Sequence, residues 1–115
     1  MSDSSEERPW GRYDVLDEGP HHKVKTITVK PGARLSYQRH SRRSEHWVVV
    51  QGEGVVTLDG AERTLAPGDT VDVPVGAAHR MANRGDEQLV FVEVQTGTYF
   101  GEDDIVRYED VYARS

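Results

Sequence analysis

Residues 32–52 read GARLSYQRHSRRSEHWVVVQG, and the ten positions from Gln38 to Trp47 hold an amide, two imidazoles and a carboxylate. Charged runs of this kind are usually solvated loops, but apolar, β-branched residues follow this one closely. In an extended chain, alternate side chains share a face, so Gln38 and His40 point to one side. Glu45 and Trp47 share a face on the next segment. The intervening loop is short enough for the two segments to be neighbours, which would bring the carboxylate opposite the amide and the imidazole.

The rest of the chain has the pattern of a small β protein. From Lys23 onward, short segments rich in valine, isoleucine, threonine and tyrosine alternate with glycine and proline, with little helical periodicity. The pair Asp59-Gly60 predicts a two-residue hairpin turn, because both residues tolerate positive φ. These features predict an all-β sandwich or barrel. The predicted strands cover residues 23–29, 35–40, 45–51, 54–58, 63–66, 70–73, 79–83 and 89–95.

Composition limits the domain count, the partners and the location. A chain of 115 residues fits one domain, and we expect a disordered N-terminal tail over 1–8 and a single domain over 9–115. The net charge of -6 at pH 7 argues against nucleic acid and against an anionic membrane as partners. Cysteine is absent, which excludes disulfides and thiolate metal sites. The chain has neither an apolar run of about 20 residues nor a signal peptide, so we expect a cytoplasmic protein.

Two motifs of glycine, proline and polar residues at fixed spacing resemble those of the cupin superfamily. The first consists of Gly32, Gln38, His40, Glu45 and Gly52, with Gln38 where histidine is commoner. The second consists of Gly68, Pro74, Gly76, His79 and Asn83. The resemblance implies a cupin double-stranded β-helix, also called a jelly-roll barrel.

Further segments resemble the phosphomannose isomerase domain of the type II mannose-6-phosphate isomerases. They are RPWGRYDVL near the start, residues 23–60 in the middle and GEDDIVRYEDVY near the end. In that family the domain is often fused behind a GDP-mannose pyrophosphorylase domain. Ser41 and Arg42 stand where the family commonly has histidine. The similarity covers nearly everything from Arg8 to Tyr112.

The resemblance implies one divalent metal and a reaction that uses it. Carried over by position, the ligands are Gln38, His40, Glu45 and His79. Two imidazoles, a carboxylate and an amide oxygen suit zinc, manganese, cobalt, nickel or iron, and contain too much nitrogen for a typical calcium or magnesium site. The implied reaction interconverts mannose 6-phosphate and fructose 6-phosphate through an enediol. A Lewis acid would stabilise charge on the substrate oxygens while a base moves the proton.

Other residues are candidates for the base and for binding the phosphate. Glu93 is a carboxylate on an otherwise apolar strand and is one candidate base. His46 is a second, although alternation aims it away from the metal that Glu45 would bind, and Tyr37 and Asp72 are weaker options. A phosphorylated sugar also needs cations, and Arg43 and Arg80 are the candidates because the planar guanidinium suits phosphate oxygens. Cations that could line the rim of the site are Lys23, Lys25, Arg34 and Arg12.

Two other functions remain open. Two histidines and a carboxylate also form the facial triad of ferrous-iron oxygenases. A non-catalytic module that binds metal or sugar is the second alternative, because one fold hosts many activities. The similarity outside the cupin motifs favours the isomerase. By analogy with cupins that pair through open edges, we expect a short edge strand near Val106 and a homodimer.

Overall fold

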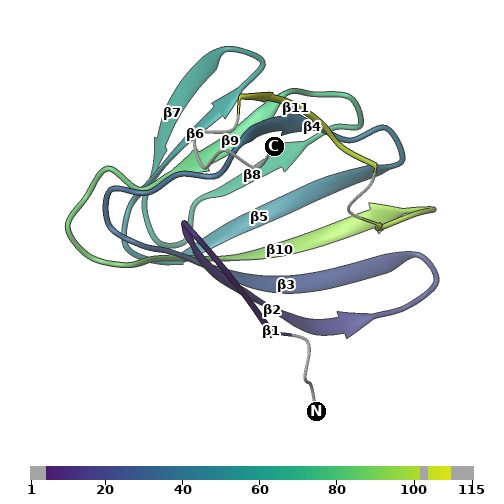
Figure 1. Ribbon diagram of the computed structural model, residues 1–115, viewed down its shortest axis with the longest axis horizontal. Helices are drawn as coiled ribbons and strands as arrows, with labels where there is room; N and C mark the ends of the chain where they lie inside the picture. Colours follow the sequence, from purple (N-terminus) through teal and green to yellow (C-terminus); the bar gives the residue numbers. More distant parts are fainter. Residues whose placement is uncertain (1–4, 102–103, 110–115) are drawn as a thin grey trace.

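The computed structural model describes residues 5–101 and 104–109, which form two antiparallel sheets packed face to face (Figure 1). The first sheet has the order β1-β2-β3-β10-β5-β8, and the second has the order β11-β4-β9-β6-β7. This arrangement confirms the all-β prediction. The strands are β1 (Ser5–Arg8), β2 (Gly11–Glu18), β3 (His22–Val29), β4 (Tyr37–Arg39), β5 (Arg43–Gln51), β6 (Gly54–Leu58), β7 (Ala61–Leu65), β8 (Thr70–Val73), β9 (His79–Ala82), β10 (Leu89–Gly97) and β11 (Val106–Glu109).

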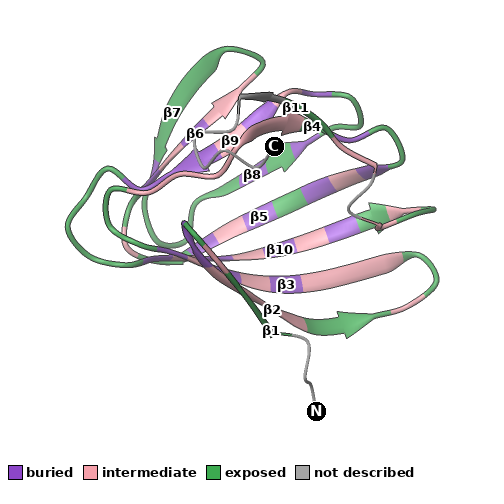
Figure 2. Ribbon diagram, in the orientation of Figure 1, coloured by how far each residue is buried: buried purple, intermediate pink, exposed green. Residues whose placement is uncertain are grey.

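The interior changes from apolar to polar along β5 and β10, which are paired neighbours. Both strands alternate between buried and less buried residues, so one face of each lines the interior (Figure 2). Phe91 is paired with Val49 at the apolar end, whereas Gln95 is paired with Glu45 at the polar end. All four side chains are buried. The apolar end therefore holds the hydrophobic core, and the polar end places hydrogen-bonding groups inside the barrel.

The N-terminal segment differs from its prediction. Residues 5–8 form β1, which pairs with β2 along its whole length, instead of the end of a disordered tail. Residues 1–4 of the expected tail lie outside the described residues, as do 102–103 and 110–115 of the expected domain. The polar composition of 5–8 was a poor guide, because an edge strand can pair through its backbone while its side chains stay in water.

Other strand predictions agree more closely. The hairpin turn at Asp59-Gly60 joins β6 to β7, and both residues have positive φ, 47° and 85°. The predicted segment 35–40 forms a strand only over Tyr37–Arg39. The strand expected near Val106 is present as β11, which pairs with β4. The homodimer stays a prediction.

The described part of the chain contains no helix long and apolar enough to cross a membrane.

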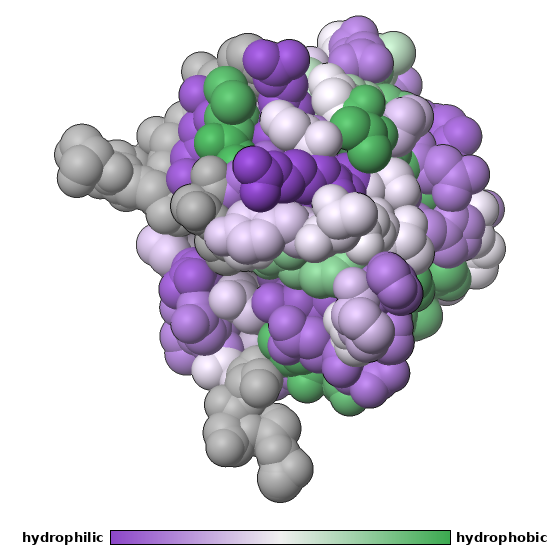
Figure 3. All heavy atoms as spheres, turned by 90° about the vertical axis from the view of Figure 1, so that its right-hand side faces the viewer, coloured by the Kyte–Doolittle hydropathy of each residue, from purple (hydrophilic) through white to green (hydrophobic). Residues whose placement is uncertain are grey.

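Figure 3 views the end of the barrel at which β10 finishes, on the right of Figure 1. The surface there is mostly hydrophilic, with apolar side chains in separate patches.

Gly11 provides a test of the packing of β2 on β3. Its φ is 152°, and an added Cβ would lie 1.9 Å from the carbonyl oxygen of Thr28. Replacement by alanine should therefore cost about 2 kcal/mol of folding free energy through backbone strain, which lowers Tm by roughly 10 °C. Thermal unfolding followed by circular dichroism measures the change. Gly85→Ala is the control, because its added Cβ would meet its nearest atom at 3.6 Å, an ordinary contact. Equal Tm values for the two variants would contradict this packing.

Candidate metal centre

The polar end of the interior brings together His40, Glu45 and His79, three of the four predicted metal ligands. Their donor atoms lie within 4.8 Å of one another, and all three residues are buried. His40 Nε2 is 3.4 Å from Glu45 Oε2, and His79 Nε2 is 3.7 Å from Glu45 Oε1. His40 directly follows β4, Glu45 lies on β5, and His79 begins β9. The two sheets therefore meet at this triad.

Backbone carbonyls fix the tautomers of both histidines. His40 Nδ1 donates to the carbonyl oxygen of Asp104 at 2.8 Å, and His79 Nδ1 donates to that of Ala77 at 2.9 Å. A carbonyl oxygen only accepts, so each Nδ1 carries the proton and each Nε2 presents a lone pair. Burial lowers the pKa of His79, and burial followed by the charge of Arg43 lowers the pKa of His40 to about 4. Both rings are therefore neutral near pH 7, as metal ligation requires.

One structural observation, which does not depend on the sequence motifs, indicates that the triad fits a divalent transition metal. His79 Nε2 is buried and has no hydrogen-bond partner among the described residues, a situation that folded proteins generally avoid unless a ligand fills the role. Two neutral imidazole nitrogens and a carboxylate are ligands that such metals prefer. The fourth predicted ligand, Gln38, is paired with His79 across β4 and β9. Its amide oxygen accepts a hydrogen bond from Ser36 Oγ at 3.4 Å.

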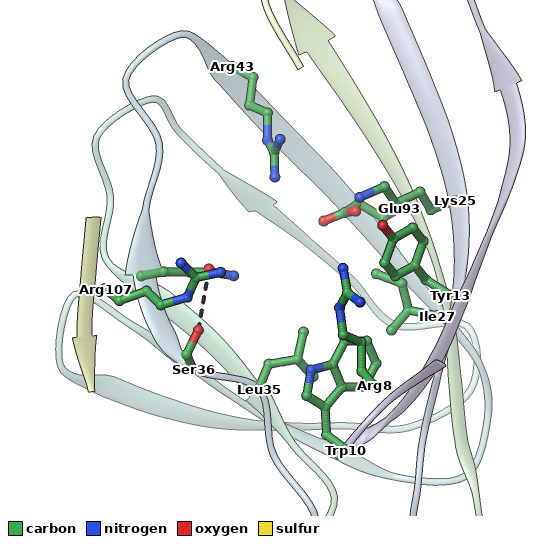
Figure 4. Close-up of a pocket in the computed structure, with 11 residues that line it drawn as sticks. Arg8, Trp10, Tyr13, Lys25, Ile27, Leu35, Ser36, Arg43, Glu93 and Arg107 are labelled. Atoms are coloured by element: carbon green, nitrogen blue, oxygen red, sulfur yellow. Dashed lines mark hydrogen bonds between the residues drawn. The ribbon is translucent and has the colours of Figure 1, made fainter. Parts of the chain in front are cut away.

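A cavity of about 210 Å³ lies beside the triad. Arg43 and Gln38, which are neighbours of the triad residues, are among the residues that line it. In Figure 4, Arg43 points into the cavity, and Lys25 and Glu93 lie side by side on one wall. Four cationic side chains and one carboxyl group line it. The charged lining residues are Arg8, Lys25, Arg43, Arg107 and Glu93. The balance of charge suits an anionic ligand.

Glu93 is connected to the triad through one indole. Trp47 Nε1 donates to Glu45 Oε1 at 2.9 Å and to Glu93 Oε2 at 3.2 Å. Gln95 Nε2 donates to the other oxygen of Glu93 at 3.0 Å. Burial, followed by the charge of Glu45, raises the pKa of Glu93 to about 8. The sequence analysis missed Gln95, although its position two residues after Glu93 on the same strand already put it on the same face.

Two predicted site residues lie elsewhere. Arg80 follows His79 on β9, so alternation turns it to the outer face, where its guanidinium carbon lies 5.7 Å from the centre of the Tyr37 ring. It does not line the cavity. His46 is exposed on the outer face of β5, with Nδ1 2.5 Å from Asp72 Oδ1. Arg80 and His46 are therefore not part of the site that the triad forms.

The two ends of the described chain supply residues that the sequence analysis did not assign to the site. Arg8 reaches the cavity from β1 and Arg107 from β11. Ser41 and Arg42 are exposed, and their backbone N–H groups donate to the carboxylate of Asp104 at 3.2 Å and 2.8 Å. The two positions at which the chain departs from the isomerase pattern are therefore on the surface and are not members of the buried triad.

Known proteins show the same pattern over most of the chain. The sequence is 52% identical over 108 residues to the alginate biosynthesis protein AlgA of Pseudomonas aeruginosa, covering 94% of this chain and 22% of that protein. It is 49% identical over 107 residues to the mannose-1-phosphate guanylyltransferase ManC of Salmonella typhimurium, covering 93% of this chain and 22% of that protein. The chain thus spans less than a quarter of either relative.

Solved structures and a family match agree on the classification. A cupin 2 conserved barrel domain protein from Salinispora arenicola superimposes with a TM-score of 0.67 and 28% identity, over 74% of each chain. This similarity confirms the predicted cupin double-stranded β-helix. Residues 2–110 match the family described as mannose-6-phosphate isomerase C-terminal. The chain belongs to that family.

Proposed function

We propose that this protein is a metal-dependent sugar-phosphate isomerase that interconverts mannose 6-phosphate and fructose 6-phosphate through an enediol. The observation that supports it most is the cavity beside the triad, where four cationic side chains meet a single carboxyl group. Family membership supports the choice of sugar. Metal ligands, cations for a phosphate and a group for proton transfer are the three components that this reaction requires.

His40, Glu45 and His79 would hold the metal, with Gln38 as a fourth ligand. A zinc, manganese, cobalt, nickel or iron ion supplies a Lewis acid that polarises the carbonyl and hydroxyl oxygens of the sugar. The protein contributes ligands from both sheets and a surrounding that excludes water, because all three triad residues are buried.

The cationic side chains would bind the phosphate of the substrate. Lys25 and Arg43 are 5% and 4% exposed, so their charges are largely removed from water and gain from a nearby anion. Arg8 and Arg107 approach from opposite sheets. A guanidinium group can donate two parallel hydrogen bonds to phosphate oxygens and so fix the orientation of the sugar.

Glu93, in its ionised form, would move the proton between the two carbons of the enediol; its pKa of about 8 makes this carboxylate a stronger base than an ordinary one. It is the carboxyl group among the described residues that line the cavity. Trp47 and Gln95 each donate a hydrogen bond to one of its oxygens, which fixes the direction in which the carboxyl group faces. We assign the base to Glu93 in preference to His46, because His46 is exposed on the opposite face of the sheet.

A conversion assay tests the proposal. Protein stripped of metal should not convert mannose 6-phosphate, and addition of zinc, manganese, cobalt, nickel or iron should restore turnover. His79→Ala should lose both bound metal and turnover, because it removes a ligand. His22→Ala, which removes an imidazole outside the triad, should retain both. Metal binding without turnover would favour a non-catalytic module, and oxygen uptake with ferrous iron would favour an oxygenase; either result contradicts the isomerase.

Glu93→Gln separates proton transfer from metal binding. The amide keeps the shape of the side chain but cannot accept the proton, so kcat should fall by about 10²- to 10⁴-fold. Metal content, measured by elemental analysis, should stay close to that of the unmodified protein. Glu53→Gln, an exposed carboxylate on a turn, is the matched control and should leave kcat unchanged. A Glu93→Gln variant with normal kcat would remove Glu93 from the mechanism.

A further inference from the structure

Arg43 uses the lone pair through which His40 would bind a metal. Its Nη2 donates to His40 Nε2 at 3.1 Å, and its Nε donates to Glu45 Oε2 at 3.0 Å. His40 Nδ1 donates to the carbonyl oxygen of Asp104, so Nε2 is the nitrogen of this ring that is left to accept. A neutral imidazole has one such lone pair. It cannot accept a hydrogen bond from Arg43 and bind a metal at the same time.

The other two ligands do not face this competition. Within the part of the chain that the structure describes, His79 Nε2 has no hydrogen-bond partner. Glu45 has two oxygens, each with more than one lone pair, so Oε1 can accept from Trp47 and still reach a metal. The conflict between guanidinium and metal is therefore located at His40. Electrostatics adds to it, because a divalent cation and a guanidinium would lie close together beside the carboxylate of Glu45 in a buried site, where like charges repel strongly.

The cavity offers Arg43 a second position. Its side chain already lines the cavity and points into it in Figure 4. A rotation about its side-chain torsions would break its hydrogen bonds to His40 and Glu45 and the longer one from Nη1 to the carbonyl oxygen of Phe100 at 3.5 Å, while leaving the guanidinium inside the barrel. There it would join Arg8, Lys25 and Arg107 and face an anion.

We propose that Arg43 and the metal exclude each other at His40, so that metal binding releases the guanidinium into the cavity as a ligand for an anion. Arg43 is thus a switch between two positions: one in which it donates hydrogen bonds to His40 and Glu45, and one in the cavity, where it would bind an anionic substrate. Coupling of this kind is reciprocal, so an anion in the cavity should tighten metal binding. The inference rests on the metal centre of the proposed function but not on isomerase turnover.

Isothermal titration of zinc into the purified protein tests the exclusion directly. Arg43→Met removes the guanidinium and keeps an unbranched side chain, so the variant should bind zinc about tenfold more tightly, as expected when a metal no longer has to break a charge-assisted hydrogen bond. Arg39→Met is the matched control. Arg39 is exposed and lies between Gln38 and His40 in the sequence, and its loss should leave zinc affinity unchanged. Equal or weaker zinc binding by Arg43→Met would overturn the proposal.

Sulfate, a divalent tetrahedral anion that stands in for a phosphate group, tests the coupling. In the unmodified protein, sulfate should tighten zinc binding severalfold, and in Arg43→Met this effect should be smaller. The same tightening in both proteins would mean that Arg43 does not carry the coupling and would contradict the switch.

The unmodified protein provides a measurement that does not depend on how the variant folds. The Nε–H resonance of Arg43 in a ¹⁵N NMR spectrum should shift when zinc is added, because the hydrogen bonds of the guanidinium change. A resonance that is unchanged at zinc saturation would overturn the proposal. Absence of zinc binding in every protein would overturn the metal centre itself, whereas the expected zinc affinities without sugar-phosphate turnover would reject the isomerase and leave the switch standing.

Discussion

The carboxylate of Glu45 lies inside a β barrel, and burial of an unpaired carboxylate costs more free energy than a small domain can spare. The structure compensates with four neighbours: Glu45 accepts hydrogen bonds from Arg43 and Trp47, and both imidazoles of the triad lie within 4.0 Å of it. Arg43 and Trp47 lie on β5 with Glu45, whereas His40 follows β4 and His79 begins β9. The positions of β5, β9 and the loop after β4 are thus linked to one buried charge, and a metal would compensate the same charge.

The barrel separates stability from function along its strands. At one end of β10, Leu89 and Phe91 are fully buried in the hydrophobic core. At the other end, Glu93 and Gln95 are also buried, but they line or support the polar site. Because side chains on a strand point to the same face at every second position, one strand serves both purposes without a change in backbone. The apolar half buries the hydrophobic core, and the polar half carries the groups of the site.

The sequence predicted the part of the site that depends on local alternation and motif spacing. His40, Glu45 and His79 meet as expected, because each lies within or directly beside a short strand. Alternation also gave the correct outward direction for His46, and the same rule applied to the strand of His79 would have turned Arg80 outward. Contacts between distant parts of the chain were not predictable in this way. The carbonyl oxygen of Asp104 accepts a hydrogen bond from His40, which lies 64 positions earlier in the sequence. Arg8 and Arg107 line the cavity because of where β1 and β11 lie, and local alternation does not determine that.

The most direct test of the metal centre is anomalous diffraction from a crystal of the zinc-loaded protein, recorded on both sides of the zinc absorption edge. The account predicts one anomalous peak inside the barrel, within bonding distance of Nε2 of His40, Nε2 of His79 and the carboxylate of Glu45. A peak elsewhere, for example at the exposed pair of His46 and Asp72, with none at the triad, would contradict it.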